Sequence, residues 1–156
     1  PNSGGDTQYV NMHAAYDGLD ASMRERLHGL YAIHVYQSRH SERKLIGLSA
    51  AQQNSLAAEV RHPLVRTHPE SGRKSLYINP IRIERIEGME DSAALELLDQ
   101  LIAHATQPRY EYRHRWQSGD LVMWDNRCLL HKANGDYDMA QLRYLLRVML
   151  QGDKPV

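Results

Sequence analysis

Two arginines near the end of the chain are spaced so that they share one face of an extended segment. Arg143 and Arg147 lie four residues apart in the run 142–150, and successive side chains of a strand alternate between its faces. The opposite face would be apolar apart from one hydroxyl: Leu142, Tyr144, Leu146, Val148 and Leu150. If that apolar face packs on the protein, two guanidiniums about 13 Å apart point into a site and need two anions. In the alternative interpretation, the run is an edge strand and both arginines face solvent, as most arginines do.

One of the nine histidines stands out by its position in the chain. His131 follows the run 119–125, which has strand character, and precedes Arg143 by twelve residues. A lone histidine is more often a surface or hydrogen-bonded residue than a ligand. A histidine and an arginine on successive strands of one sheet can share a pocket, however, so we take His131 and Arg143 as candidates for one site.

The elements around these residues are mostly extended. Strands are expected at 7–11, 63–68, 74–79, from Tyr110 onward, at 121–124 and at 143–150. The second and third strands form a hairpin, because the segment 69–72 between them has turn chemistry. The polar segment 36–61, with a short helix at 49–60, is interpreted as an insertion over the core.

Two helical regions are also expected. The first carries an apolar stripe at three- and four-residue steps: Leu19, Met23, Leu27 and Leu30. The second begins at a cap on Asp91 or Ser92, ends near Thr106 and buries one face: Ala94, Leu95, Leu98, Leu101, Ile102 and Ala105. These patterns predict a mainly β protein, an antiparallel sandwich with flanking helices.

The composition fits a single domain and excludes several classes of protein. In 156 residues, 19 basic side chains balance 19 acidic ones, so no net field would attract nucleic acid or an anionic membrane. The single Cys128 excludes an intramolecular disulfide, and no apolar run is long enough to span a membrane. We therefore expect a cytoplasmic protein with a small-molecule ligand, and we expect a homo-oligomer.

Six motifs occur in an order and spacing that point to a known family. They are Gly4-Gly5-Asp6-Thr7, Val65-Arg66-Thr67-His68-Pro69, Ser71-Gly72, Gly119-Asp120, Trp124-Asp125-Asn126-Arg127 followed by His131, and Arg143 with Arg147 before Gly152-Asp153-Lys154-Pro155. Together they resemble the taurine dioxygenase and 2,4-dichlorophenoxyacetate dioxygenase family, over essentially the whole chain. Members of that family are iron(II)- and 2-oxoglutarate-dependent dioxygenases.

The resemblance implies a double-stranded β-helix (jelly roll) that holds iron(II) by two histidines and one carboxylate. On matching positions, His131 is the catalytic iron ligand, Arg143 pairs with the far carboxylate of 2-oxoglutarate, and Thr7 adds a hydrogen bond to it. Arg147 matches the substrate-binding arginine, and a second anion agrees with the pattern of the arginine strand.

The resemblance also assigns roles to the motif around Trp124. This side chain would form a wall near the metal. Asp125, Asn126 and Arg127 are expected to be structural hydrogen-bonding residues rather than ligands.

The sequence departs from the family in one respect. The family's first two iron ligands form a His-x-Asp motif upstream of Gly-Gly-Asp-Thr, and no His-x-Asp occurs here. Two His-x-Glu triplets, at 40–42 and 68–70, are expected not to bind iron, because one lies in the insertion and the other begins the hairpin turn. The chain also starts without Met, so we expect it to be the C-terminal part of a catalytic domain, N-terminally incomplete and inactive alone.

The resemblance predicts a dioxygenase that uses O2 to hydroxylate an anionic small molecule, with release of succinate and CO2. A sulfonate, a sulfate ester or an aryloxyalkanoate-like acid would each satisfy Arg147. One alternative is a catalytically inactive jelly-roll binding protein that has lost its metal site. The other is a different metal enzyme of cupin-like fold, in which Arg143 and Thr7 would have no reason to converge.

Overall fold

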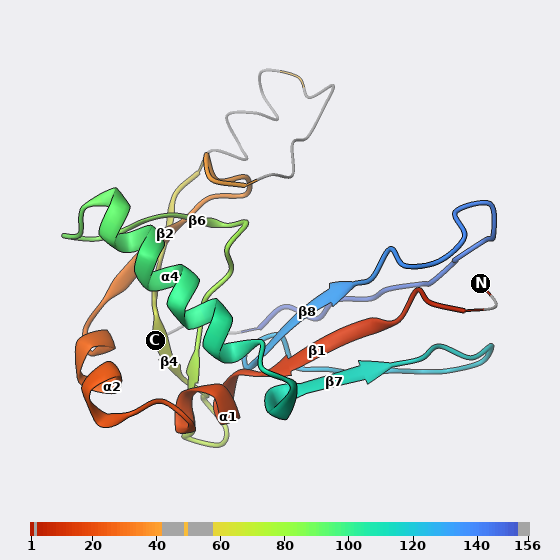
Figure 1. Ribbon diagram of the computed structural model, residues 1–156, viewed down its shortest axis with the longest axis horizontal. Coiled ribbons are helices and arrows are strands. Elements are labelled where there is room, and N and C mark those ends of the chain that lie inside the picture. The colour runs from red at the N-terminus through yellow and green to blue at the C-terminus, as the bar shows by residue number, and fades with distance from the viewer. Residues whose placement is uncertain (2, 42–48, 50–57, 153–156) are drawn as a thin grey trace.

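The computed structural model describes residues 1, 3–41, 49 and 58–152. Its strands are β1 (Thr7–Asn11), β2 (Tyr31–His34), β3 (Val60–Pro63), β4 (Val65–Thr67), β5 (Lys74–Leu76), β6 (Ile83–Ile86), β7 (Glu111–His114) and β8 (Leu129–Ala133). The helices are α1 (Met12–Asp17), α2 (Ala21–Leu27), α4 (Asp91–Ala105) and the 3-10 turn η1 (Pro108–Tyr110). The protein is thus mainly β with a few helices, as predicted (Figure 1). None of the helices in these ranges is long and apolar enough to cross a membrane.

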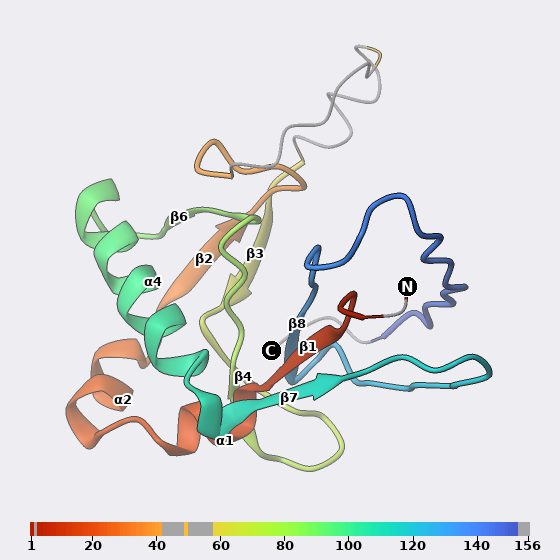
Figure 2. The same ribbon diagram turned by 45° about the vertical axis from the view of Figure 1, so that its right-hand side comes forward.

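The strands form three antiparallel sheets, in the orders β7-β1-β8, β3-β2-β6 and β4-β5. In the first sheet, β1 lies in the centre and pairs with segments that are more than a hundred residues away in the chain. Thr7 is opposite His114 of β7, and Tyr9 is opposite His131 of β8. Figure 2 shows this sheet extending away from the helices as an arm. The start of the chain is therefore placed directly beside the predicted metal ligand.

Helix α4 covers the other part of the molecule and contributes most to its core. Ala94, Leu97, Leu98, Leu101 and Ala105 face inward, and Leu97 and Leu101 are completely buried. They pack in one cluster with apolar residues of α1, β2, β5 and β6. The predicted helix is confirmed, but two details were wrong. Leu95 is 37% exposed, and the N-cap is Glu90, which makes no side-chain capping hydrogen bond.

The first helical region is divided into two short helices, where a continuous stripe was expected. Asn11 caps α1 by accepting hydrogen bonds from the backbone N–H groups of His13 and Ala14. Gly18 is the C-cap of α1, and a side chain there would collide with the hydroxyl of Tyr110. The side chain of Asp20 then caps α2. Capping side chains, which the apolar stripe does not reveal, therefore set the boundaries.

The predicted hairpin is confirmed, with β4 and β5 paired from Val65↔Leu76 to Thr67↔Lys74. Gly72 adopts a positive φ of 68° in its turn, a conformation that favours glycine. Strands β2, β6 and β8 were not predicted, and β3 was predicted only at its last residue. The expected helix 49–60 lies mostly outside the described residues, and Val60, at its end, begins β3.

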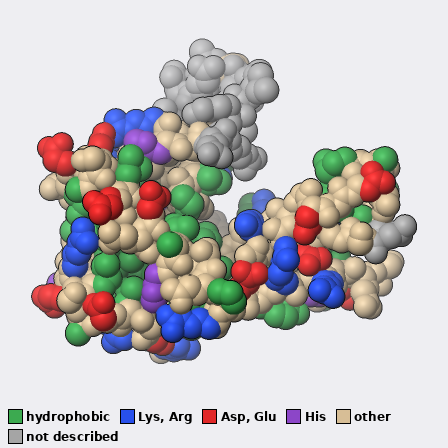
Figure 3. Space-filling model, viewed as in Figure 1, with side chains coloured by type: hydrophobic (Ala, Val, Ile, Leu, Met, Phe, Trp, Pro, Cys, Tyr) green, Lys and Arg blue, Asp and Glu red, His purple; other side chains and the backbone are tan. Residues whose placement is uncertain are grey.

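Two predicted strands, 121–124 and 143–150, do not form regular strands. The expected apolar face of 143–150 is exposed: Leu142 84%, Tyr144 72%, Leu146 84%, Val148 88% and Leu150 91%. A strand needs a hydrogen-bonding partner, and the run 143–150 pairs with none of the strands among the described residues. In Figure 3, hydrophobic side chains accordingly lie at the surface of the arm. Alternation alone could not reveal that this run has no described partner.

Candidate functional site

The first part of the site lies where the chain enters β1. The guanidinium of Arg143 donates from Nε to the backbone carbonyl of Gly5 at 2.8 Å, and its Nη2 lies 3.4 Å from Oγ1 of Thr7. Thr7 is 6% exposed and Arg143 is partly buried. The structure thus brings together two of the predicted site residues, 136 positions apart, although the run that carries Arg143 is not a regular strand.

Two glycines allow this close approach. Gly4 and Gly5 both have φ near 70°, and a Cβ on Gly5 would meet the side chain of Arg143 at 3.2 Å. A Cβ on Gly4 would collide with the backbone of Asp136, whose carboxylate in turn accepts a hydrogen bond from the N–H of Gly5. The two glycines before Asp6 therefore allow a backbone conformation with positive φ, and the side chain of Arg143 can lie directly against this backbone.

His131 lies on the same face of the sheet as Thr7. In β1, Thr7 and Tyr9 are two residues apart and so point to one side, and His131 is directly opposite Tyr9. The rings of His131 and Tyr9 stack with centroids 6.2 Å apart, and the ring of Trp124 lies 5.2 Å from that of His131. Trp124 is thus a wall beside the predicted metal ligand, as expected.

Burial, and secondly the positive charge of Arg147, lower the pKa of His131 below its usual value of 6.5. The imidazole is therefore neutral at pH 7, and this is the form that binds a metal. Arg147, the source of this charge effect, is itself exposed. Thr7, Arg143 and His131 are thus brought together at the β7-β1-β8 sheet, whereas no described contact fixes the side chain of Arg147.

The environment of Arg143 fits a ligand carboxylate. Its hydrogen-bond partners, a carbonyl and a hydroxyl, are uncharged, and no carboxylate of the described residues forms an ion pair with it. A partly buried guanidinium has five N–H donors in a planar fork and is stabilised by an anion. Arg143 and Thr7 can therefore bind one carboxylate together.

The donor set for a metal is only partly present in the described ranges. A facial iron site needs two histidines and one carboxylate. Only one group of three possible metal-binding side chains is found there, His68, Asp125 and Cys128, and it does not include His131. Of the three ligands that such a site needs, the described residues thus offer only the predicted one, His131.

The group around Asp125 is a hydrogen-bonded network instead. Arg127 donates to both carboxylate oxygens of Asp125 at 2.6 to 2.9 Å, and its Nη2 also pairs with Glu70 at 2.9 Å. Nδ1 of His68 accepts from the N–H groups of Glu70 and Ser71, so its Nε2 carries the proton and donates to Asp125 at 3.1 Å. The carboxylate of Asp125 is thus already bound by the guanidinium of Arg127 and by His68. Through these contacts the network connects the hairpin turn to the segment before β8.

These contacts agree with the structural role expected for Asp125 and Arg127. Asn126 likewise accepts a hydrogen bond from the indole of Trp124 at 2.9 Å and so orients this wall. The triplet at 68–70 contributes to the network rather than to a pair of ligands beside His131. In the other triplet, Glu42 lies outside the described residues.

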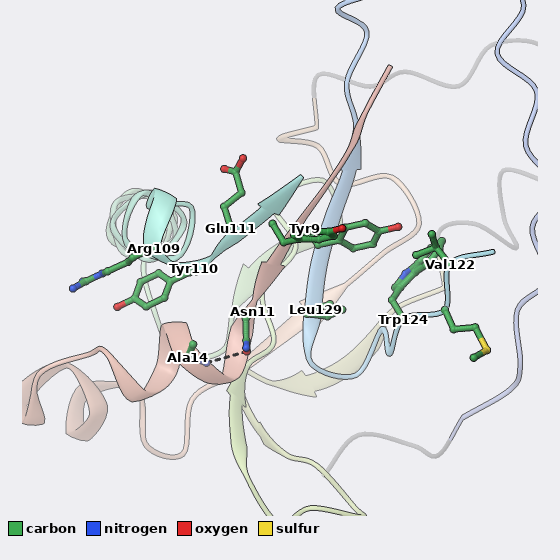
Figure 4. A pocket seen from close by; sticks show the side chains of 11 residues that line it. Tyr9, Asn11, Ala14, Arg109, Tyr110, Glu111, Val122, Trp124 and Leu129 are labelled. Carbon is green, nitrogen blue, oxygen red and sulfur yellow. Dashed lines mark hydrogen bonds between the residues drawn. The ribbon is translucent and has the colours of Figure 1, made fainter. Parts of the chain in front are cut away.

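A cavity of about 420 Å³ lies beside Tyr9 and Trp124, and most of its lining was not predicted from the sequence. Tyr9 and Trp124, which both contact His131, form part of its wall together with Leu129 and the segment 109–112. Figure 4 shows Tyr9 and Leu129 on neighbouring strands, with Trp124 on the segment beside them. The alternation of β1 could have identified Tyr9, because it shares a face with Thr7. The segment 109–112 gave no such signal.

Comparison with known proteins agrees with this geometry. Residues 1–149 match the model of the family described as "Taurine catabolism dioxygenase TauD, TfdA family". Over its whole length, the chain is 44% identical to an alpha-ketoglutarate-dependent 2,4-dichlorophenoxyacetate dioxygenase from Cupriavidus pinatubonensis, covering 53% of that protein. It is 40% identical to an (S)-phenoxypropionate/alpha-ketoglutarate-dioxygenase from Sphingobium herbicidovorans, with 98% of the chain and 54% of the relative covered.

Among solved structures, that of AAD-2 in complex with Mn(II) and N-oxalylglycine superimposes with a TM-score of 0.79 at 35% identity. The superposition covers 89% of this chain and 54% of AAD-2. The chain spans about half the length of the curated relatives that it matches. The predicted resemblance is confirmed: the chain belongs to the TauD/TfdA family of dioxygenases.

Proposed function

We propose that the protein is an iron(II)- and 2-oxoglutarate-dependent dioxygenase that hydroxylates an anionic small molecule and releases succinate and CO2. The observation that carries the proposal is the pair Thr7 and Arg143 on the same sheet face as the neutral imidazole of His131. The pair binds the far carboxylate of 2-oxoglutarate. A metal bound to His131 would hold the opposite end of 2-oxoglutarate. The relatives named above depend on the same cosubstrate.

Iron(II), together with 2-oxoglutarate and O2, supplies the oxidising power for this reaction, and the protein supplies positions. His131 contributes one ligand in its metal-binding protonation state. Arg143 and Thr7 fix the cosubstrate's orientation, and Trp124 and Tyr9 shield one side of the imidazole from water. The two further iron ligands lie outside the set that the described residues provide. The 156-residue chain alone is therefore predicted to be inactive.

Arg147 is proposed to bind the anionic group of the substrate. It lies close enough to His131 to affect the imidazole's pKa, whereas Arg143 is held by Gly5 and Thr7. The neighbouring cavity has aromatic walls, which suit a planar ring. An aryloxyalkanoate-like acid combines both features and is the favoured substrate class, ahead of an aliphatic sulfonate or a sulfate ester. The names of the relatives, which act on 2,4-dichlorophenoxyacetate and phenoxypropionate, support this choice.

The remaining proposals concern the fold and the setting. We propose that residues 1–156 form one unit of a jelly-roll catalytic domain. The cytoplasmic location, the homo-oligomer and the absence of nucleic-acid and membrane partners stay predictions.

The proposal is tested on the protein expressed from its complete open reading frame. Succinate should form only when iron(II), 2-oxoglutarate and an aryloxyalkanoate are all present, and a sulfonate and a sulfate ester serve as competing substrates. Arg143→Ala should raise the KM for 2-oxoglutarate by about 30-fold or more, because a charge-assisted pair is lost. Arg85→Ala, which removes an exposed arginine paired with Glu59, is the matched control and should leave it unchanged. An unchanged KM in Arg143→Ala would refute the assignment.

One structural observation favours a second candidate, an inactive binding protein. The described residues provide a carboxylate site but a single metal ligand. In that case 2-oxoglutarate would bind in an Arg143-dependent manner, and no succinate would form with any substrate class.

A further inference from the structure

A tryptophan outside the predicted site makes a direct hydrogen bond to it. The indole Nε1–H of Trp116 donates to Oγ1 of Thr7 at 2.9 Å, across 109 residues of sequence. Nη2 of Arg143 approaches the same oxygen at 3.4 Å. Trp116 was not among the predicted site residues.

These two contacts determine where the hydroxyl proton of Thr7 can point. A threonine hydroxyl has one donor hydrogen and two acceptor lone pairs. The indole and the guanidinium can only donate, so between them they occupy both lone pairs. The proton is left to point away from both groups, either toward the buried phenol oxygen of Tyr9 on the same strand face or toward an acceptor that shares the site with Arg143.

Neighbouring residues hold Trp116 in this position. It follows β7 by two residues, and its ring meets that of His114 edge-on with centroids 4.5 Å apart. His114 is fixed in turn by Asp120, whose carboxylate lies 3.0 Å from Nε2 of the histidine and also accepts a hydrogen bond from the N–H of Gln117. The turn after β7 thus presents the indole N–H to Thr7.

We infer that Trp116 is a positioning residue, which orients the hydroxyl of Thr7 so that its proton is donated to the far carboxylate of 2-oxoglutarate. This inference rests on the proposed function. Trp116 itself does not touch the ligand. Without the indole N–H of Trp116, the hydroxyl proton of Thr7 can rotate among its staggered positions. Only one of these positions directs the proton toward the carboxylate. Affinity for 2-oxoglutarate should then fall by about 3- to 10-fold, the range expected for one misdirected hydrogen bond.

The test is a double-mutant cycle on the protein from its complete open reading frame, with Mn(II) in place of iron so that no turnover occurs. Calorimetric titration gives the Kd of 2-oxoglutarate for the unsubstituted protein, Trp116→Phe, Thr7→Val and the double variant. Trp116→Phe should weaken binding by 3- to 10-fold alone and should have no further effect in the Thr7→Val background. A second ligand, 2-oxobutyrate, lacks the far carboxylate, and its Kd should not respond to Trp116→Phe.

Three outcomes would overturn the inference. One is an equal loss from Trp116→Phe in both backgrounds, and another is an equal loss for both ligands, since each indicates a general structural effect. In the third outcome, Arg143→Ala raises the Kd of 2-oxoglutarate but Trp116→Phe leaves it unchanged. This result would overturn the inference and leave the proposed function standing. If the unsubstituted protein bound no 2-oxoglutarate, the proposed function would fail and the inference with it.

The hydrogen bond can also be observed without ligand. Trp116 and Trp124 each contribute an indole N–H signal to a nitrogen–proton correlation spectrum. Thr7→Val should move the Trp116 signal upfield and speed its exchange with solvent, and Thr7→Ser, which keeps the hydroxyl, should not. An unmoved signal in Thr7→Val would show that the bond is absent.

Discussion

Replacing Asp125 by Asn tests whether the network beside β8 is a structural support. The carboxylate accepts three side-chain contacts from Arg127 at 2.6 to 2.9 Å, one from the backbone N–H of Arg127 at 2.8 Å and one from His68 at 3.1 Å. An asparagine keeps the shape but has one oxygen and one NH2 group. Whichever way the amide is turned, its NH2 meets a donor, either the guanidinium or the protonated Nε2 of His68.

The expected loss in the free energy of unfolding is about 2 kcal/mol at pH 7. Charge-assisted hydrogen bonds contribute about 1.5 to 3 kcal/mol each, and we take the lower part of this range because the side chain of Asp125 is 33% exposed and partly screened. Urea unfolding followed by circular dichroism measures this change. Asp138→Asn is a matched control, since the carboxylate of Asp138 serves only exposed contacts within its own turn.

The same variant has a defined pH dependence. The side chain of Arg127 is the main cause that holds the pKa of Asp125 well below its usual 3.8. The folded state therefore favours the ionised carboxylate, and this stabilisation is present above pH 3.8 and lost as the pH falls further. The difference between Asp125→Asn and the unsubstituted protein should shrink below pH 3.8. A change of less than about 0.5 kcal/mol at pH 7, the range of ordinary surface substitutions, would refute the reasoning.

Three further predictions concern other parts of the molecule. Arg147→Ala should raise the apparent Kd of an anionic substrate by about 30- to 1000-fold in a binding titration and that of 2-oxoglutarate far less, and equal weakening of both would contradict its role. Leu101→Ala should lower the free energy of unfolding by about 2 to 5 kcal/mol, because Leu101 is completely buried. Leu95→Ala, at a position that is 37% exposed, should lower it clearly less. Equal losses would mean that the buried face of α4 is misassigned. Burial, followed by the charges of His62 and Arg82, lowers the pKa of His34 from 6.5 to about 4. The free energy of unfolding should therefore fall by up to about 3 kcal/mol as the pH drops from 6.5 to about 4. His34→Phe should reduce this pH dependence.

The site residues could be predicted better than the elements that carry them. Arg143 reaches Thr7 as the family motifs implied, yet the strand expected to present it is absent from the structure. The guanidinium is held by the backbone of Gly5, and no alternation pattern reports such a contact. Motifs identify side chains that meet, whereas periodicity identifies strands only where a partner strand is available.

The same distinction applies to the elements themselves. The helix α4 was predictable because five buried side chains repeat on one face over 15 residues. Strands β2 and β6 are four residues long, too short for alternation to stand out, and the long-range pairing of β1 with β8 left no mark in either local sequence. Trp116 was missed as a site residue because its N–H bond to Thr7 depends on the equally long-range pairing of β1 with β7.

The most direct test of the account is succinate production by the protein from its complete open reading frame, with and without His131→Ala. We predict iron(II)-dependent conversion of 2-oxoglutarate by the unsubstituted protein and none above background by the variant, which lacks the imidazole beside Tyr9 and Trp124. His28→Ala removes an exposed histidine at the end of α2 and should retain turnover. Full turnover by His131→Ala would show that the iron is held elsewhere and would contradict the proposed site.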